Sequence, residues 1–157
     1  MRLALYQPDI PQNTGAMLRL AACFSLGVDV ILPAGFILED KRMRRAGMDY
    51  IDQVEVARHS SWAAYLESRD RGGRILLLTT KGDRAYTDFA YAAGDTLLVG
   101  RESSGVPPEV AEAADARLVI PMRPGLRSLN VAMAAAIVTG EAVRQLGQSK
   151  SSARLVS

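Results

Sequence analysis

The feature that most constrains the fold is an alternation of short apolar runs with helical stretches. Five runs have the length and composition of buried strands, at residues 3–6, 28–32, 75–79, 96–99 and 118–120. Four stretches have helical character, at residues 14–26, 61–69, 107–114 and 129–146. Strands that are apolar throughout and alternate with helices are typical of a parallel sheet covered on both faces. The sequence therefore predicts an α/β fold with a mostly parallel sheet flanked by helices.

The length of 157 residues favours a single domain. We expect this domain to span residues 1–147. Residues 148–157 are rich in serine and lack acidic side chains, which predicts a disordered tail. The single cysteine, Cys23, excludes a disulfide framework, and the single histidine, His59, leaves too few ligands for a catalytic zinc. No metal cofactor is expected.

The longest strictly apolar run covers residues 131–138, far short of the roughly 20 residues that cross a membrane. The N-terminus has a strand pattern interrupted by proline and does not resemble a signal peptide. We therefore expect a cytoplasmic protein with no membrane partner.

The same run, VAMAAAIV, is apolar on every face of the helix that we expect there. A helix of this kind must be covered on all sides, either by other elements of the chain or by a second subunit. We prefer the second interpretation, a homodimer formed through the C-terminal helix.

The net charge of +2 permits a nucleic-acid partner without demanding one. One basic cluster stands out, formed by Lys41, Arg42, Arg44 and Arg45, and acidic residues flank it on both sides. It is either a surface that contacts RNA or an ordinary solvated helix face.

Three polar segments could carry chemistry. Residues 100–105 have the glycine spacing of a P-loop but lack the lysine that follows it, and the first strand is not followed by a dinucleotide-binding glycine pattern. The other two segments hold Asn13 with Arg19, and Ser128 with Asn130. Each alone is explained by a turn, a helix cap or an exposed arginine. Because all three follow predicted strands, we expect them to converge at one sheet edge, where ligands bind in open α/β folds.

Together these segments resemble the three motifs of the SPOUT superfamily of RNA methyltransferases, in its ribose 2′-O branch. PQNTGAMLR at residues 11–19 is similar to the first motif, LVGRESSGVP at residues 98–107 to the second, and IPMRPGLRSLN at residues 120–130 to the third. RRAGMDY at residues 44–50 and LTTKG at residues 78–82 resemble the small members that methylate the wobble nucleotide, position 34, of tRNA leucine isoacceptors.

The resemblance implies a homodimer whose C-terminal part is a trefoil knot, and S-adenosylmethionine as cofactor, released as S-adenosylhomocysteine. It places the cofactor against Leu78, Gly100, Ile120, Ser128 and Leu129. It places four polar residues around the reaction: Asn13, Arg19, Glu102 and Asn130. The family assigns the role of base to the arginine that matches Arg19. Arginine is normally protonated, so Arg19 either acts through an unusual proton transfer or holds a phosphate and the developing alkoxide.

The chain departs from the family pattern at five positions: Arg101, Ser104, Ala132, Met133 and Gly140. These departures concern RNA contacts more than cofactor binding. The leading hypothesis is 2′-O-methylation of cytidine or modified uridine at position 34 of tRNA. The alternatives are a methyltransferase for ribosomal RNA or another tRNA position, and a non-catalytic RNA-binding protein on the same fold.

Overall fold

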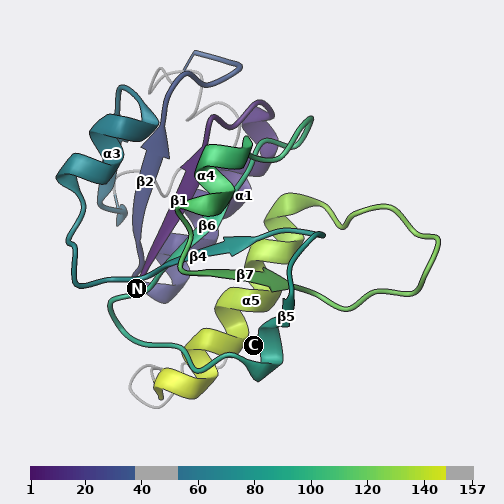
Figure 1. Cartoon of the computed structure of the whole chain (residues 1–157). Helices are drawn as coiled ribbons and strands as arrows, with labels where there is room; N and C mark the ends of the chain where they lie inside the picture. The colour runs from purple at the N-terminus through teal and green to yellow at the C-terminus, as the bar shows by residue number, and fades with distance from the viewer. Residues whose placement is uncertain (38–52, 148–157) are drawn as a thin grey trace, which may run out of the picture.

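The computed structural model describes residues 1–37 and 53–147. The described residues form one seven-stranded sheet in the order β3-β2-β1-β6-β4-β7-β5, and all neighbouring strands run parallel (Figure 1). In chain order the strands are β1 Arg2–Tyr6, β2 Gly27–Ile31, β3 Val56–His59, β4 Ile75–Leu78, β5 Arg84–Ala85, β6 Thr96–Val99 and β7 Ala116–Val119. The predicted parallel α/β architecture is confirmed.

Helices cover both faces of the sheet. They are α1 Pro11–Phe24, α3 Trp62–Ser68, α4 Pro108–Glu112 and α5 Val131–Leu146, with a 3-10 turn, η2 Tyr86–Asp88. One hydrophobic cluster joins α1 and α5 to the sheet, and a second joins α3 and α4 to it. Helices α1 and α5 also pack against each other.

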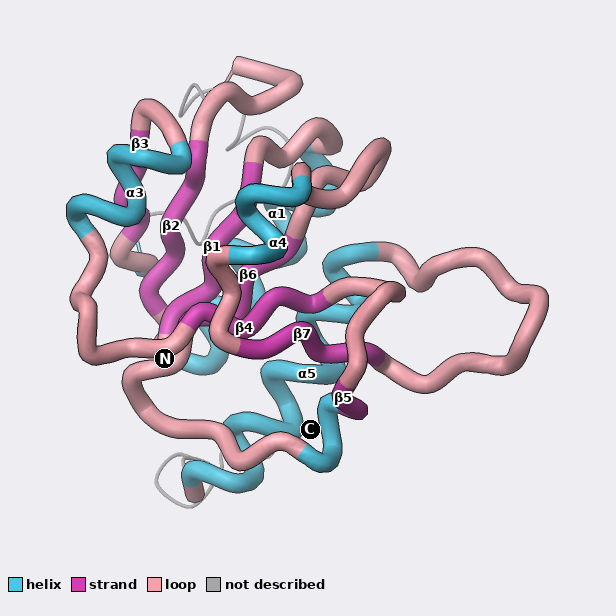
Figure 2. The backbone as a smooth tube through the Cα atoms, viewed as in Figure 1, coloured by secondary structure: helices cyan, strands magenta, loops and turns pink. Residues whose placement is uncertain are grey.

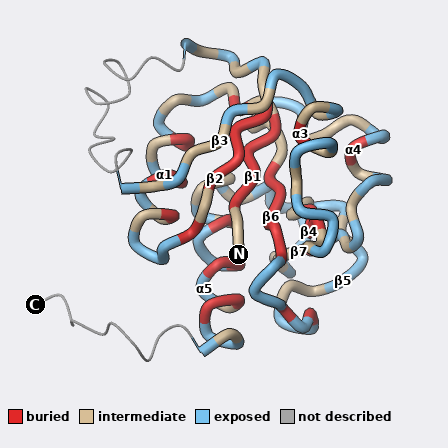
Figure 3. Tube along the Cα trace, turned by 90° about the vertical axis from the view of Figure 1, so that its left-hand side faces the viewer, coloured by how far each residue is buried: buried red, intermediate tan, exposed pale blue. Residues whose placement is uncertain are grey.

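The strand β1 shows why both faces are covered. Leu3 and Leu5 belong to the cluster under α1 and α5, whereas Ala4 and Tyr6 belong to the cluster under α3 and α4. Successive side chains of a strand point to opposite faces, so an uninterrupted apolar run needs a helix layer on each side. Figure 3 shows the result, with the central strands buried and the outer turns of the helices exposed.

Some predicted boundaries were wrong. The strand β3 was missed because it is a half-buried edge strand with the mixed sequence VARH, and β5 has only two residues. The helix α1 begins at Pro11, so Asn13 lies within its first turn and is not a cap. Asn130 is the N-cap of α5, and its side chain accepts from the backbone N–H groups of Ala132 and Met133.

The order of the strands creates a switch point between β1 and β6. From β1 the chain builds β2 and β3 on one side of the sheet, and β4 through β7 all lie on the other side. Loops that leave the carboxyl ends of β1, β4, β6 and β7 therefore meet near one edge. The longest of them joins β7 to α5 and extends away from the sheet (Figure 2).

Candidate functional site

A cavity of about 410 Å³ lies at the carboxyl ends of the strands. Four parts of the chain form its wall: the start of α1, the end of β4, the turn after β6, and the stretch from the end of β7 into the first turn of α5. The residues are Ile10 and Asn13; Leu78, Thr79 and Thr80; Gly100, Arg101, Glu102 and Gly105; and Val119, Ile120, Met122, Ser128, Leu129, Asn130, Val131 and Ala134. Crevices at this position, beside a switch point, are where open parallel sheets bind ligands. The volume is within the range of roughly 300–1,000 Å³ for small-molecule sites.

The structure brings together eight of the nine residues predicted for cofactor and reaction. Those in the cavity wall are Asn13, Leu78, Gly100, Glu102, Ile120, Ser128, Leu129 and Asn130. The ninth, Arg19, is an exposed residue of α1 and is not among the described residues of this wall. The four predicted RNA-contacting residues, Lys41, Arg42, Arg44 and Arg45, lie outside the described residues.

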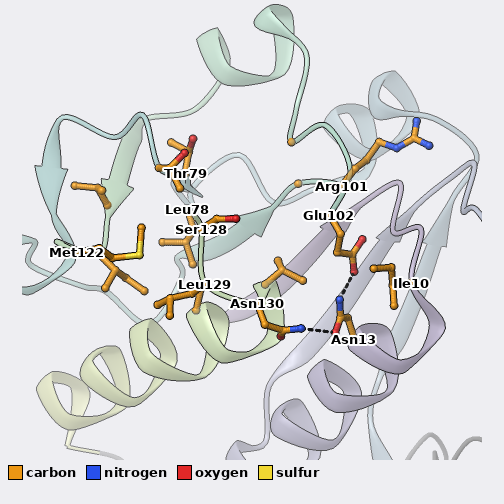
Figure 4. Close-up of a pocket in the computed structure, with 17 residues that line it drawn as sticks. Ile10, Asn13, Leu78, Thr79, Arg101, Glu102, Met122, Ser128, Leu129 and Asn130 are labelled. Atoms are coloured by element: carbon orange, nitrogen blue, oxygen red, sulfur yellow. Dashed lines mark hydrogen bonds between the residues drawn. The ribbon is translucent and has the colours of Figure 1, made fainter. Parts of the chain in front are cut away.

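A chain of hydrogen bonds runs along the polar side of the cavity (Figure 4). Asn130 donates from Nδ2 to Oδ1 of Asn13 at 2.8 Å, and Asn13 donates from Nδ2 to Oε1 of Glu102 at 3.1 Å. Its direction is fixed at one end, because Oδ1 of Asn130 accepts from two backbone N–H groups of α5. Both amides must therefore donate toward Glu102, and Glu102 Oε1 must accept.

Glu102 is held from its other side by Asp9, which follows β1. The backbone N–H of Asp9 donates to Glu102 Oε2 at 3.2 Å, and the backbone N–H of Glu102 donates to Asp9 Oδ1 at 3.0 Å. Burial, followed by the hydrogen bond with Asp9, raises the pKa of Glu102. The hydrogen bonds with Glu102 and Ser103 hold the pKa of Asp9 well below its usual range. At neutral pH, Asp9 is ionised, and Glu102 binds a proton more readily than an ordinary glutamate.

Residues 100–105 form a tight turn that carries Glu102. Arg101 and Gly105 exchange two backbone hydrogen bonds, of 3.0 and 2.9 Å, and Gly105 has a positive φ of 70°. A Cβ atom on Gly100 would lie 2.6 Å from the carbonyl carbon of Gly105, so no side chain fits there. The requirement for glycine at position 100 thus arises within the turn itself. Arg101 Nη1 donates to Gln7 Oε1 at 3.4 Å, and Arg101 Nε lies 3.8 Å from Asp9 Oδ2.

The opposite side of the cavity is mainly apolar, with Leu78, Ile120, Met122 and Leu129 in its wall. Ser128 adds a hydroxyl group on the loop before α5. Figure 4 shows Leu78, Met122, Ser128 and Leu129 across the cavity from the hydrogen-bonded chain of Asn130, Asn13 and Glu102. The site therefore combines an apolar compartment, suited to an organic cofactor, with a polar compartment that can orient a hydroxyl group.

Sequence reasoning missed several residues of this site. Asp9 supports Glu102 from outside the cavity, whereas Ile10, Thr79 and Met122 line it. The signal for Asp9 was its place at the carboxyl end of β1, which lies beside β6 in the sheet. Among the described residues, no group of three or more histidine, cysteine or acidic residues could hold a metal ion.

The doubly covered parallel sheet and the cavity at its switch point define a ligand-binding α/β domain with a polar site beside an apolar pocket. A model of the SpoU rRNA Methylase family matches residues 1–140 of this chain. A protein of Beijerinckia indica called tRNA (cytidine(34)-2'-O)-methyltransferase is 58% identical over 146 residues, covering 92% of this chain and 91% of the relative.

Two solved structures have the same fold. One, from work on 2-OH methylation of C/U34 on tRNA, is 41% identical with a TM-score of 0.88 and covers 93% of this chain and 95% of that chain. The other is an AdoMet-bound rRNA methyltransferase from Sinorhizobium meliloti, 26% identical with a TM-score of 0.83; the match covers 92% of this chain and 56% of that one.

The chain belongs to the SpoU rRNA Methylase family, and its class of reaction is methyl transfer. The family membership that the three sequence motifs indicated is confirmed. Among the described residues, no helix is both long and apolar enough to span a bilayer.

Proposed function

We propose that this protein is an S-adenosylmethionine-dependent methyltransferase that modifies the ribose 2′ oxygen of nucleotide 34 in tRNA leucine isoacceptors. The base there is cytidine or a modified uridine. The observation that carries the proposal is the convergence of Asn13, Glu102 and Asn130 beside an apolar pocket. The identity of 58% to a relative with a position-34 name supports the choice of substrate.

The cavity fits the cofactor. Leu78, Ile120 and Leu129 offer apolar surface for an adenosine ring, and Gly100 brings backbone to the wall without a side chain. Ser128 adds a hydroxyl that can bind the polar part of the cofactor. When bound, S-adenosylmethionine supplies an electrophilic methyl group carried by a sulfonium ion.

The polar side of the cavity then acts on the substrate ribose. Asn13 and Asn130 fix Glu102 in one orientation. Glu102 would accept the proton of the 2′ hydroxyl as the oxygen takes the methyl group and the bond between the methyl carbon and sulfur breaks, which leaves S-adenosylhomocysteine. A raised pKa suits this task, because a base works best when its pKa approaches the working pH. Alignment of the reacting groups supplies much of the acceleration.

Arg19 takes part only if two subunits build the site. It lies on the exposed side of α1, outside the described wall of its own cavity. In a homodimer, Arg19 of one protomer would reach the cavity of the other, where its guanidinium can bind the phosphate next to the reacting ribose.

An exposed apolar stripe supports this homodimer. Met133, Ala136, Ile137 and Gly140 follow one another on the outer face of α5, and Met133 and Ile137 are 58% and 38% exposed. The wholly apolar run at 131–138 is thus covered on one side only. A second copy of this chain, packed through α5 beside α1, would cover the stripe.

The remaining parts of the proposal concern chain path and substrate. We infer a trefoil knot formed by the long loop at 120–130 and α5, within a single domain of residues 1–147. The basic cluster Lys41, Arg42, Arg44 and Arg45 would contact the tRNA phosphates. The protein would act in the cytoplasm, where its tRNA substrates are found.

Mapping of 2′-O-methylation in total tRNA tests the substrate directly. A strain that lacks the gene should lose the modification at position 34 of tRNA leucine and keep it elsewhere. Loss at another tRNA position or in ribosomal RNA would contradict the substrate. Calorimetry with S-adenosylmethionine should detect binding; no binding would favour a non-catalytic RNA-binding protein.

A further inference from the structure

We propose that Asp9 is a positioning residue for methyl transfer, which holds Glu102 and the turn at residues 100–105 in place without touching cofactor or substrate. The inference rests on the proposed function, because it assigns Asp9 a role only through Glu102. Asp9 is not part of the described cavity wall, whereas Glu102 is.

The contacts between Asp9 and the turn are reciprocal. The backbone N–H of Asp9 donates to the Glu102 carboxylate at 3.2 Å, and the backbone N–H of Glu102 donates to the Asp9 carboxylate at 3.0 Å. The hydroxyl of Ser103 donates to Asp9 Oδ2, and Arg101 Nε lies 3.8 Å from the same oxygen. One carboxylate thus contacts three consecutive residues of the turn, and both oxygens of Glu102 accept hydrogen bonds from fixed donors.

The backbone at Asp9 is held by the loop after β2. The backbone N–H of Gly35, in the loop after β2, donates to the carbonyl of Pro8 at 2.8 Å. A Cβ atom on Gly35 would lie 2.9 Å from both Cα and Cβ of Asp9, so this loop can pack closely only because it has no side chain there. The loops after β1, β2 and β6 therefore meet at Asp9.

Asp9 affects the protonation of Glu102 as well as its position. Among the described residues, the charged residue that is hydrogen-bonded to Glu102 is Asp9, from the loop after β1, and Arg101 Nε lies 3.8 Å from Asp9 Oδ2. The neighbours from α1 and from the cap of α5 are the neutral amides of Asn13 and Asn130. Burial raises the pKa of Glu102 and the hydrogen bond with Asp9 raises it further, so an ionised Asp9 favours protonation of Glu102.

Two substitutions separate geometry from charge. Asp9→Asn keeps an oxygen that accepts from the Glu102 N–H and removes the charge, whereas Asp9→Ala removes both. Asp70→Asn is the matched control, because Asp70 also accepts from a backbone N–H, that of Gly72 at 3.0 Å, in the loop that precedes β4, at the opposite end of that strand from the cavity. The measurements are cofactor binding by calorimetry and the single-turnover rate of methyl transfer to tRNA leucine transcripts from pH 5 to 9.

We expect Asp9→Ala to slow transfer roughly ten- to hundredfold, as misplaced reacting groups do, with cofactor affinity within a few-fold of wild type. Asp9→Asn should shift the acidic limb of the pH–rate profile to lower pH by roughly half a unit or more, because the negative charge beside Glu102 is gone. A merely structural role would leave that limb in place.

The outcomes are distinguishable. An inactive wild-type enzyme contradicts the proposed function. An active wild type with Asp9→Asn indistinguishable from Asp70→Asn in rate and in pH profile contradicts the inference alone. Should Asp9→Ala fail to fold, the profile of Asp9→Asn still decides the question.

Discussion

Asn130 donates from Nδ2 to Oδ1 of Asn13 across 2.8 Å, although 117 positions separate the two residues in the chain. This bond joins the cap of α5 to the first turn of α1, and through Asn13 it reaches Glu102. The cap of one helix thereby sets the orientation of a carboxylate on a third segment, the turn after β6.

Substitution of Asn130 should separate capping from orientation. Asn130→Asp keeps the oxygen that caps α5 but replaces the donor to Asn13 with a second acceptor, so the chain toward Glu102 is broken. We expect near wild-type thermal stability and a loss of methyl transfer of at least about tenfold. Asn130→Ala should lose the transfer and also about 1 kcal/mol of stability with the cap. Full activity in Asn130→Asp would show that the bond between the two asparagines is dispensable.

A side chain at Gly100 should close the cofactor pocket. Gly100→Val places carbon atoms against the backbone of Gly105, where even a Cβ would lie at 2.6 Å, so the turn that lines the cavity must shift. We expect S-adenosylmethionine binding to be lost in calorimetry while circular dichroism stays near wild type. The control is Gly94→Ala, because a Cβ there would lie at an ordinary 3.8 Å from its nearest neighbour, Gly73 Cα. Retained binding in Gly100→Val would exclude this turn from the pocket.

The apolar stripe on α5 gives a test of assembly. Ile137→Glu would bury an unpaired charge in the proposed interface, which is strongly unfavourable. We expect wild-type protein to sediment as a dimer at micromolar concentration and Ile137→Glu as a monomer or as insoluble protein. Ile37→Glu, at an isoleucine that is 59% exposed and outside α5, should remain dimeric. A wild-type chain that sediments at 16.9 kDa would refute both the dimer and a site shared between subunits.

Substitution of Arg19 should separate methyl transfer from cofactor binding. Because Arg19 lies outside the described cavity wall, Arg19→Ala should keep cofactor affinity within a few-fold and lose methyl transfer by orders of magnitude. Arg19→Lys keeps the charge but not the planar fork that binds phosphate in a bidentate manner, so we expect it to be nearly as inactive. Near wild-type turnover by Arg19→Ala would remove Arg19 from the mechanism.

The sequence predicted those parts of the site that depend on residue type and order along the chain. The apolar runs of β1 and β6 indicated a doubly covered sheet, and the three polar segments indicated where their loops meet. The placement of Asn13, Glu102 and Asn130 in one cavity agrees with that expectation. Residues near in sequence determine the strands and the polar segments, and the segments converge because loops at the carboxyl ends of parallel strands meet at one edge of the sheet.

What the sequence did not reveal depends on contacts between distant segments. Asp9 has no motif of its own, and its importance comes from a turn that lies more than ninety positions away, as the separation of 93 from Glu102 shows. The strand β3 is an edge strand, so its burial pattern is mixed and its sequence does not alternate clearly. The exposure of Met133 and Ile137 could not be deduced from a helix that is apolar on every face.

The most direct test of the whole account measures methyl transfer to a tRNA leucine transcript and to the same transcript with a 2′-deoxyribose at position 34 only. Purified wild-type protein and labelled S-adenosylmethionine are sufficient for the assay. We expect incorporation of close to one methyl group per molecule into the ribose transcript and none into the 2′-deoxy transcript, because the accepting oxygen is missing from the latter. Equal incorporation into both, or none into either, would contradict the assignment of the 2′ oxygen of nucleotide 34 as the methyl acceptor.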